Sequence, residues 1–226
     1  MIKSNRIFYF LVILITVVSI GIRYYYAATQ ELWIDEVLVL QIAHENDWKQ
    51  TALVEHWDKS HPPLLHLYTK VLLKFISYDD KIALRFLSFF LGGLATIPLM
   101  RYIKVTHKSA TAAILGGILF AINPTITANS FSLRPYGVII FLFLIFLAST
   151  RNLDLHSDVK KYQKMILINI IIIFSFFWDY SSIWFLLPFA VITVIKVKSK
   201  VYPFVKCTPL STHKTDWFKI HSFQLK

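Results

Sequence analysis

Six apolar segments restrict what this chain can fold into more than any other feature. They cover residues 7–22, 82–100, 110–122, 137–149, 165–178 and 181–195. A helix that crosses a bilayer needs about 20 mostly apolar residues, with a lower limit near 17. The last four segments therefore each need flanking residues. Because lipid offers no hydrogen-bond partner to a non-helical backbone, the segments predict an all-α, polytopic membrane bundle of about six transmembrane helices.

The composition also favours a membrane protein. The 226 residues are 56% apolar and 16% charged, whereas soluble domains are about 45–50% apolar and about 25% charged. This excess argues against a soluble globule and excludes a disordered chain. The single cysteine excludes a disulfide framework and a cysteine-based zinc ribbon.

The basic residues predict the topology. If the N-terminus is cytoplasmic, sixteen of the 24 Lys and Arg but only three of the 13 acids lie in the inside pieces, 1–6, 101–109, 150–164 and 196–226. Cytoplasmic loops carry such an excess of Lys and Arg. We therefore expect both termini in the cytoplasm and the active side outside, at the cell (plasma) membrane. The net charge of +11 is then a topology signal. No nucleic-acid partner is expected, because the basic residues are dispersed and form no single stripe.

The first apolar segment has features of a signal peptide and of a membrane anchor. Lys3 and Arg6 precede it, and Ala27 with Ala28 offers a cleavage site. The segment is long, however, and the tyrosines at 24–26 are typical of an interfacial aromatic anchor. We expect an uncleaved first span.

The spans divide the chain into a membrane domain, residues 1–195, and a basic cytoplasmic tail, residues 196–226. The large outer loop, 23–81, holds nine of the thirteen acids. Its helix-compatible stretches at 37–43 and 64–73 are expected to lie along the outer membrane face as interfacial helices.

The adjacent acids Asp35 and Glu36 follow the first span and are the first candidates for chemistry. A carboxylate there can act as a general base if it reaches the proton that it removes. Neighbouring helical side chains point about 100° apart, so one carboxylate is expected to act directly and the other in support. The alternative is an acidic helix start that favours the helix dipole.

The run His61-Pro62-Pro63 supplies the second candidate. The two prolines fix the backbone and disfavour helix before them. His61 with Asp58 or Asp35 could bind a divalent cation, because imidazole and carboxylate are ordinary metal ligands. No established metal-site spacing is present. The alternative is a proline-marked helix start with surface histidines.

Two arginines complete the set. Arg85 lies in or near the second span, where it either faces the protein interior or snorkels to the interface. Arg134 lies where an anionic lipid headgroup would lie, and a guanidinium binds phosphate in a bidentate way. The alternative is a plain interfacial arginine with Tyr136 as an aromatic anchor. With the topology above, all these groups fall on the outer side, which favours one site for a substrate with an anionic, lipid-anchored part.

These elements, in this order, resemble the membrane glycosyltransferases of the protein mannosyltransferase and lipid A aminoarabinose transferase type (glycosyltransferase family 39-like), which have the GT-C fold. The likeness covers residues 7–195. Four short motifs carry it: the acidic pair within 33–36, the His-Pro-Pro-Leu run at 61–64, the Arg-x-x-Ser-x-x-x-Gly pattern at 85–92 and the Arg-x-Tyr element at 134–136.

The resemblance implies a GT-C-like bundle and a polyprenyl-phosphate sugar donor, with transfer on the outer face to a protein, lipid or glycan acceptor. Asp35 matches the catalytic carboxylate that removes a proton from the acceptor hydroxyl, and Glu36 would support it. Donor-phosphate and substrate binding would fall to Arg134, Tyr136, Arg85 and His61. Metal use varies within this fold, so a divalent cation at His61 and Asp58 stays an open cofactor.

The span count departs from the family, because full members usually continue through as many spans again. We therefore expect the chain to correspond to the N-terminal half, as a fragment, a frameshifted product or a degenerate member. A natively short chain would call for a partner subunit. The alternative function is a non-catalytic membrane protein that binds a lipid-linked sugar or such a partner. A small transporter is disfavoured, because no pair of broken helices is evident.

Overall fold

The computed structural model describes residues 2–53, 63–151, 158–179 and 182. These residues form helices and no strand, which confirms the all-α class for the described part of the chain. The helices are α1 (Ile2–Thr29), α2 (Ile34–Glu45), α3 (Trp48–Ala52), α4 (Pro63–Leu72), α5 (Lys81–Leu94), α6 (Thr96–His107), α7 (Ala110–Ile122), α8 (Pro124–Phe131), α9 (Tyr136–Arg151) and α10 (Asp158–Trp178).

Two helical runs are long and apolar enough to cross a membrane: Arg6–Thr29 in α1, and Lys81–His107, which joins α5 and α6. A third candidate arises if α7 and α8 count as one bent span. The shorter apolar helices Tyr136–Ser149 and Ile168–Trp178 match the fourth and fifth expected segments, and the sixth, 181–195, lies almost wholly outside the described residues. The structure is thus consistent with a membrane protein, with two or three helices long and apolar enough to span a membrane against the six spans expected.

The bend of 60° between α7 and α8 has a local cause. Pro124 is the first residue of α8, and Asn123 before it has an extended backbone with ψ of 118°. The Asn123 side chain accepts a hydrogen bond from the Ile126 amide at 2.9 Å and so caps the new helix. The Asn-Pro pair therefore ends one helix and starts another in a new direction.

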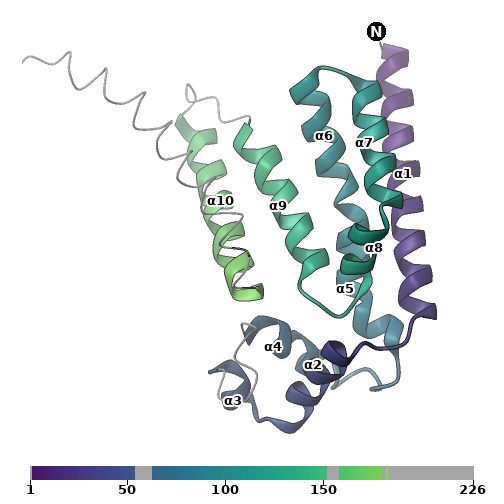
Figure 1. Ribbon diagram of the computed structural model, residues 1–226. Coiled ribbons are helices and arrows are strands. Elements are labelled where there is room, and N and C mark those ends of the chain that lie inside the picture. Colours follow the sequence, from purple (N-terminus) through teal and green to yellow (C-terminus); the bar gives the residue numbers. More distant parts are fainter. Residues whose placement is uncertain (1, 54–62, 152–157, 180–181, 183–226) are drawn as a thin grey trace, which may run out of the picture. The chain divides into compact units, whose positions relative to one another are not determined.

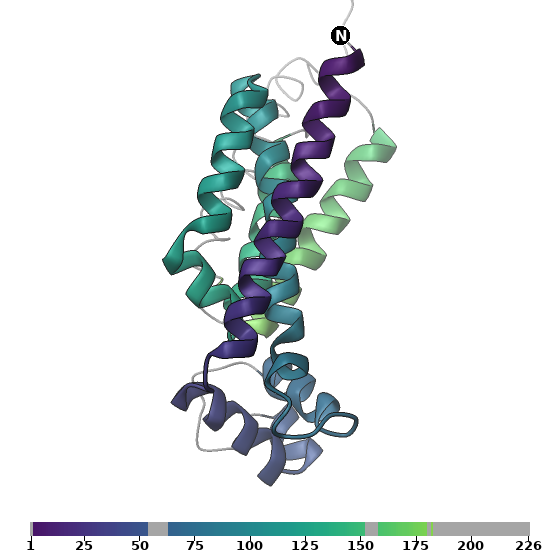
Figure 2. The same cartoon turned by 90° about the vertical axis from the view of Figure 1, so that its right-hand side faces the viewer.

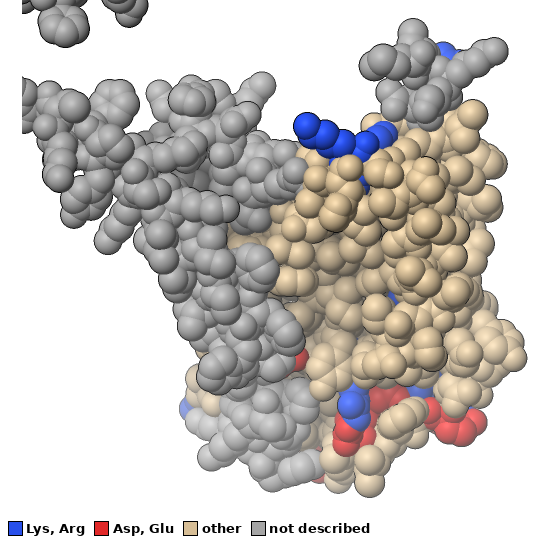
Figure 3. Space-filling model, turned by 45° about the horizontal axis from the view of Figure 1, so that its top comes forward, with Lys and Arg blue, Asp and Glu red and all other residues tan. Residues whose placement is uncertain are grey.

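Helix α1 packs against α5, α7 and α8, and α9 packs against α5 and α6 (Figures 1 and 2). Two glycines of α5 permit close approaches: a Cβ on Gly93 would lie 2.4 Å from Ile20 of α1, and one on Gly92 would lie 2.7 Å from Ser130 of α8. Figure 3 shows charged side chains gathered at two ends of the described surface, with a largely uncharged band between them. Such a band is what a bilayer requires of the surface that faces it.

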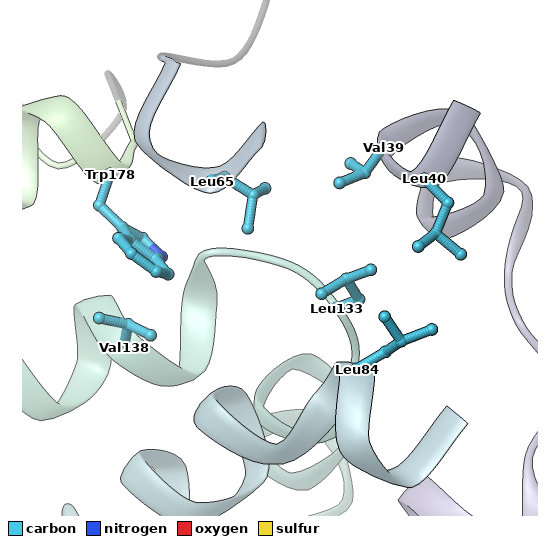
Figure 4. Close-up of a cluster of buried hydrophobic side chains, with 7 residues drawn as sticks. All are labelled: Val39, Leu40, Leu65, Leu84, Leu133, Val138 and Trp178. Atoms are coloured by element: carbon cyan, nitrogen blue, oxygen red, sulfur yellow. The ribbon is translucent and has the colours of Figure 1, made fainter. Parts of the chain in front are cut away.

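Helices α2, α3 and α4 lie at the end of the bundle where α1 ends (Figure 1). Helices α2 and α4 confirm the two helix-compatible stretches of the outer loop. The Lys70 ammonium of α4 donates to the carbonyl of Ala43 at 2.8 Å and so holds the last turn of α2. A buried apolar cluster joins α2 and α4 to α5, α9, α10 and the 132–135 loop: Val39, Leu40, Leu65, Leu84, Leu133, Val138 and Trp178 (Figure 4).

Candidate active site

The first turn of α2 separates the two adjacent carboxylates. Glu36 is fully buried, whereas the Asp35 side chain is 48% exposed. Because consecutive helical side chains point in different directions, one acid faces the protein and the other faces outward. Asp35 alone of the pair is accessible to a substrate.

Glu36 accepts hydrogen bonds from four N–H groups. Its Oε1 accepts from Arg85 Nε at 2.9 Å and from the Leu133 amide at 2.5 Å. Its Oε2 accepts from Arg85 Nη2 at 2.6 Å and from the Trp33 amide at 2.9 Å. A carboxylate offers about four lone-pair sites, so this buried group is fully satisfied.

Arg85 uses every N–H that a guanidinium has. Besides its bonds to Glu36, Arg85 donates through Nη1 to the backbone carbonyls of Ala27 and Gln30, at 2.9 and 2.8 Å. Its Nη2 also donates to the backbone carbonyl of Glu31 at 2.9 Å. These carbonyls lie at and beyond the last turn of α1, where helix carbonyls lack partners. Of the two sequence interpretations of Arg85, the structure shows the one in which it faces the protein interior. In this arrangement no N–H of Arg85 remains for a ligand phosphate. Arg85 instead holds together the helix ends and the acidic side chain to which it donates hydrogen bonds.

Arg134 differs from Arg85 in its surroundings. Its Nη2 forms an ion pair with Asp35 Oδ2, and its side chain is 23% exposed. No other residue in the described part of the chain accepts a hydrogen bond from this guanidinium. One carboxylate takes at most two of the five N–H groups in a bidentate pair. Arg134 thus keeps several donors for another anion.

The backbone around Arg134 is fixed from two sides. The Leu133 amide donates to Glu36 at 2.5 Å, and Ser88 Oγ of α5 donates to the Arg134 carbonyl at 2.9 Å. The Tyr136 ring centre lies 6.0 Å from Arg134 Cζ, within cation–π range. The structure therefore brings Asp35, Arg134 and Tyr136 together from α2, the 132–135 loop and α9, as a site requires.

Gly137 permits this approach of α9. A Cβ there would lie 2.3 Å from the Ser88 carbonyl and 2.9 Å from the Ser130 carbonyl. Both atoms are backbone and cannot swing aside. Only glycine therefore fits where the start of α9 meets α5 and α8.

Arg23 is a buried residue that the sequence analysis missed, since it was placed at the start of the outer loop. It lies inside α1 and is fully buried. Its Nε donates to Ser130 Oγ at 2.7 Å, and its Nη1 donates to Ser19 Oγ at 2.6 Å. Its Cζ lies 5.3 Å from the Phe120 ring centre, and its Nη2 has no hydrogen-bond partner among the described residues. The spacing of four between Ser19 and Arg23, on one helix face, is the signal that could have indicated a buried arginine.

Two further contacts lie at the end of the bundle that carries α2 and α4. Lys81 forms an ion pair with Glu31, and the hydrogen bond and charge of Lys81 lower the pKa of the Glu31 carboxyl. Tyr68 of α4 packs on Trp178 with ring centres 5.7 Å apart. Burial raises the pKa of the Tyr68 phenol.

The expected metal ligands are not placed. His61 and Asp58 lie outside the described residues. Within residues 2–53, 63–151, 158–179 and 182, no three His, Cys, Asp or Glu side chains form a group that could hold a metal ion.

The site pairs the accessible carboxylate of Asp35 with the guanidinium of Arg134, which has unused N–H donors. A carboxylate can remove a proton from a hydroxyl, and a guanidinium can stabilise a phosphate. Comparisons with protein-family models, with curated proteins and with solved structures find no match for this chain.

Proposed function

We propose that this chain is a membrane glycosyltransferase of the GT-C type, which moves a sugar from a polyprenyl-phosphate donor to a hydroxyl of a protein, lipid or glycan acceptor on the outer face of the membrane. The observation that supports this best is the pairing of half-exposed Asp35 with Arg134 at one end of an apolar bundle. A carboxylate base and a phosphate-binding cation are the two groups that such a transfer needs.

In the proposed reaction the acceptor oxygen attacks the anomeric carbon while Asp35 takes the hydroxyl proton. The bond from that carbon to the phosphate oxygen breaks, and the phosphate leaves with the electron pair. Arg134 stabilises the charge that develops on the leaving phosphate. This single displacement inverts the anomeric centre. Glu36 and Arg85 are positioning residues, because they are buried and hold the backbone on both sides of the site.

The proposal extends to the whole membrane domain. The apolar segments at 137–149, 165–178 and 181–195 would complete a bundle of about six spans. Both termini would be cytoplasmic, by the charge distribution. A divalent cation at His61 and Asp58 belongs to the same proposal, with imidazole and carboxylate as ligands.

The test is sugar transfer by the full chain in proteoliposomes, with labelled polyprenyl-phosphate hexose and pentose donors. Asp35→Asn is expected to abolish transfer and leave membrane insertion intact. The matched control is Glu45→Gln, which neutralises an exposed acid at the other end of the same helix. Full transfer by Asp35→Asn contradicts the proposal. Donor binding without transfer by the unaltered chain favours the non-catalytic alternative.

A further inference from the structure

The ion pair between Asp35 and Arg134 joins the two groups that the proposed reaction uses. A guanidinium on a carboxylate oxygen competes with an acceptor hydroxyl for the lone pairs of that oxygen. We infer that this ion pair is a resting contact, that a phosphate-ester oxyanion displaces Asp35 from Arg134, and that the exchange frees the Asp35 carboxylate for the acceptor. This inference rests on the proposed function and adds an order to it: the phosphate binds before the base is released.

Arg134 is suited to such an exchange. Its side chain is 23% exposed, and Asp35 is its single hydrogen-bonding or ionic side-chain partner in the described part of the chain. A planar guanidinium matches phosphate oxygens in a bidentate way. The phosphodiester of the proposed donor carries one negative charge, as a carboxylate does, and its two non-bridging oxygens offer the same bidentate geometry. Phosphate can therefore compete with Asp35 for the same donors.

Asp35 can leave Arg134 at a small cost in free energy. Its side chain is 48% exposed, and Arg134 is its one ionic partner among the residues that the structure describes. Ion pairs at this exposure are weak, because water solvates the separated charges. A change of side-chain rotamer is enough to turn the carboxylate toward solvent.

The backbone on both sides stays fixed during the exchange. The first turn of α2 is held through buried Glu36, which binds Arg85 and the Leu133 amide independently of Asp35. The 132–135 loop is held through the same amide and through Ser88 Oγ, which donates to the Arg134 carbonyl. The two exchanging side chains therefore move on a scaffold that needs no rearrangement.

The direct test is carboxyl labelling of the full, unaltered chain in lipid nanodiscs. A diazo reagent esterifies accessible carboxyl groups, and mass spectrometry reports the extent at each acid. Addition of a polyprenyl phosphate is expected to raise labelling of Asp35 about two- to fivefold, the factor expected when a weak, partly exposed ion pair opens. Labelling of Glu45, an exposed acid of the same helix, should not change. Neutral polyprenol is the control for the lipid tail.

Two variants make the test independent of the label. In Arg134→Gln, labelling of Asp35 should be high from the start and insensitive to polyprenyl phosphate. In Asp35→Asn, polyprenyl phosphate should bind about two- to fivefold more tightly, because its competitor is gone. Glu31→Gln removes a negative charge that is paired with Lys81 instead, and controls for the general effect of charge on anion binding.

The outcomes separate the inference from the proposed function. If polyprenyl phosphate binds through Arg134 and Asp35 labelling stays constant, the exchange is wrong and the proposed function survives. If polyprenyl phosphate does not bind, both are wrong. Inorganic phosphate is the second probe: an equal rise in labelling shows that the oxyanion alone drives the exchange, and a rise with the lipid only shows that the tail contributes. Both of those results support the exchange.

Discussion

Glu36 and Arg85 form a buried ion pair with two hydrogen bonds, at 2.9 and 2.6 Å, and neither side chain reaches solvent. The pair joins the end of α1, the first turn of α2, helix α5 and the 132–135 loop. Asp35 is adjacent in sequence to Glu36, and Arg134 is adjacent to Leu133, so both accessible residues neighbour members of this network. The buried pair thus sets the distance between the two accessible groups of the candidate site.

Breaking that pair should be costly. Glu36→Gln leaves the Arg85 charge buried without a counter-charge, and the loss of one partner of a buried ion pair costs about 3–5 kcal/mol. The measurement is the free energy of unfolding in detergent micelles. Replacing both residues, in E36M/R85M, should recover part of the loss because no unpaired charge remains. A Glu36→Gln variant as stable as the unaltered chain would show that the pair does not hold the site.

Arg23 provides the contrast. It is as buried as Arg85, but among the described residues its partners are the hydroxyls of Ser19 and Ser130 and the Ser19 carbonyl, and not a carboxylate. Arg23→Met therefore removes a buried charge and leaves no opposite charge behind, so we expect a cost below about 2 kcal/mol, from the lost hydrogen bonds. Arg85→Met, which strands Glu36, should cost about 3–5 kcal/mol. Unfolding of the two variants under the same conditions compares them directly, and an equal loss would mean that Arg23 has a charge partner.

The ion pair between Glu31 and Lys81 should make stability depend on pH. The pKa of Glu31 is lowered in the fold by the hydrogen bond and charge of Lys81. A carboxyl with a lowered folded pKa contributes stability above its unfolded pKa, and this contribution disappears as the pH falls through the folded value. The Tm of the unaltered chain should therefore fall more steeply below pH 5 than that of Glu31→Gln, with identical slopes near pH 7. The difference should shrink in high salt, since the pair is on the surface. Parallel curves over the whole pH range would contradict the assignment.

Several parts of this arrangement follow from sequence rules. That Asp35 and Glu36 point in different directions follows from helix geometry, although which of them faces inward depends on packing. The break at Asn123-Pro124 follows from the conformational limits of proline. The interior position of Arg85 was one of two interpretations, because a lone arginine near a span can also snorkel. Local patterns carry no information on which distant residues meet. The pairing of Asp35 with Arg134 and of Arg23 with Ser130 depends on how α1, α2, α5 and α8 pack, and so needed the structure.

Helix α8 also shows what local sequence patterns cannot predict. The apolar segments at 110–122 and 137–149 leave residues 123–136 as a connection between two expected spans. The structure instead begins a new helix at Pro124 and continues it to Phe131, which leaves only a short loop at 132–135. Proline is unfavourable inside a helix and favourable at its first position. The Asn123-Pro124 pair therefore ends α7 and starts α8, and the Asn123 side chain caps the new helix.

Alanine substitutions at Gly137 and at Gly21 form a matched pair. In Gly137→Ala the new Cβ meets the Ser88 carbonyl at 2.3 Å and the Ser130 carbonyl at 2.9 Å, so the start of α9 must move away from α5 and α8. Overpacking of this kind costs about 1–3 kcal/mol. Gly21 lies within α1 and has nothing within 4 Å of its Cβ position, so Gly21→Ala should be neutral or stabilising by about 0.5–1 kcal/mol through helix propensity.

Because the Arg134 carbonyl is bound to Ser88, movement of α9 should also reduce sugar transfer by Gly137→Ala, while Gly21→Ala keeps it. Unfolding and transfer measured on both variants test this, and equal behaviour of the two would rule out the close approach at Gly137.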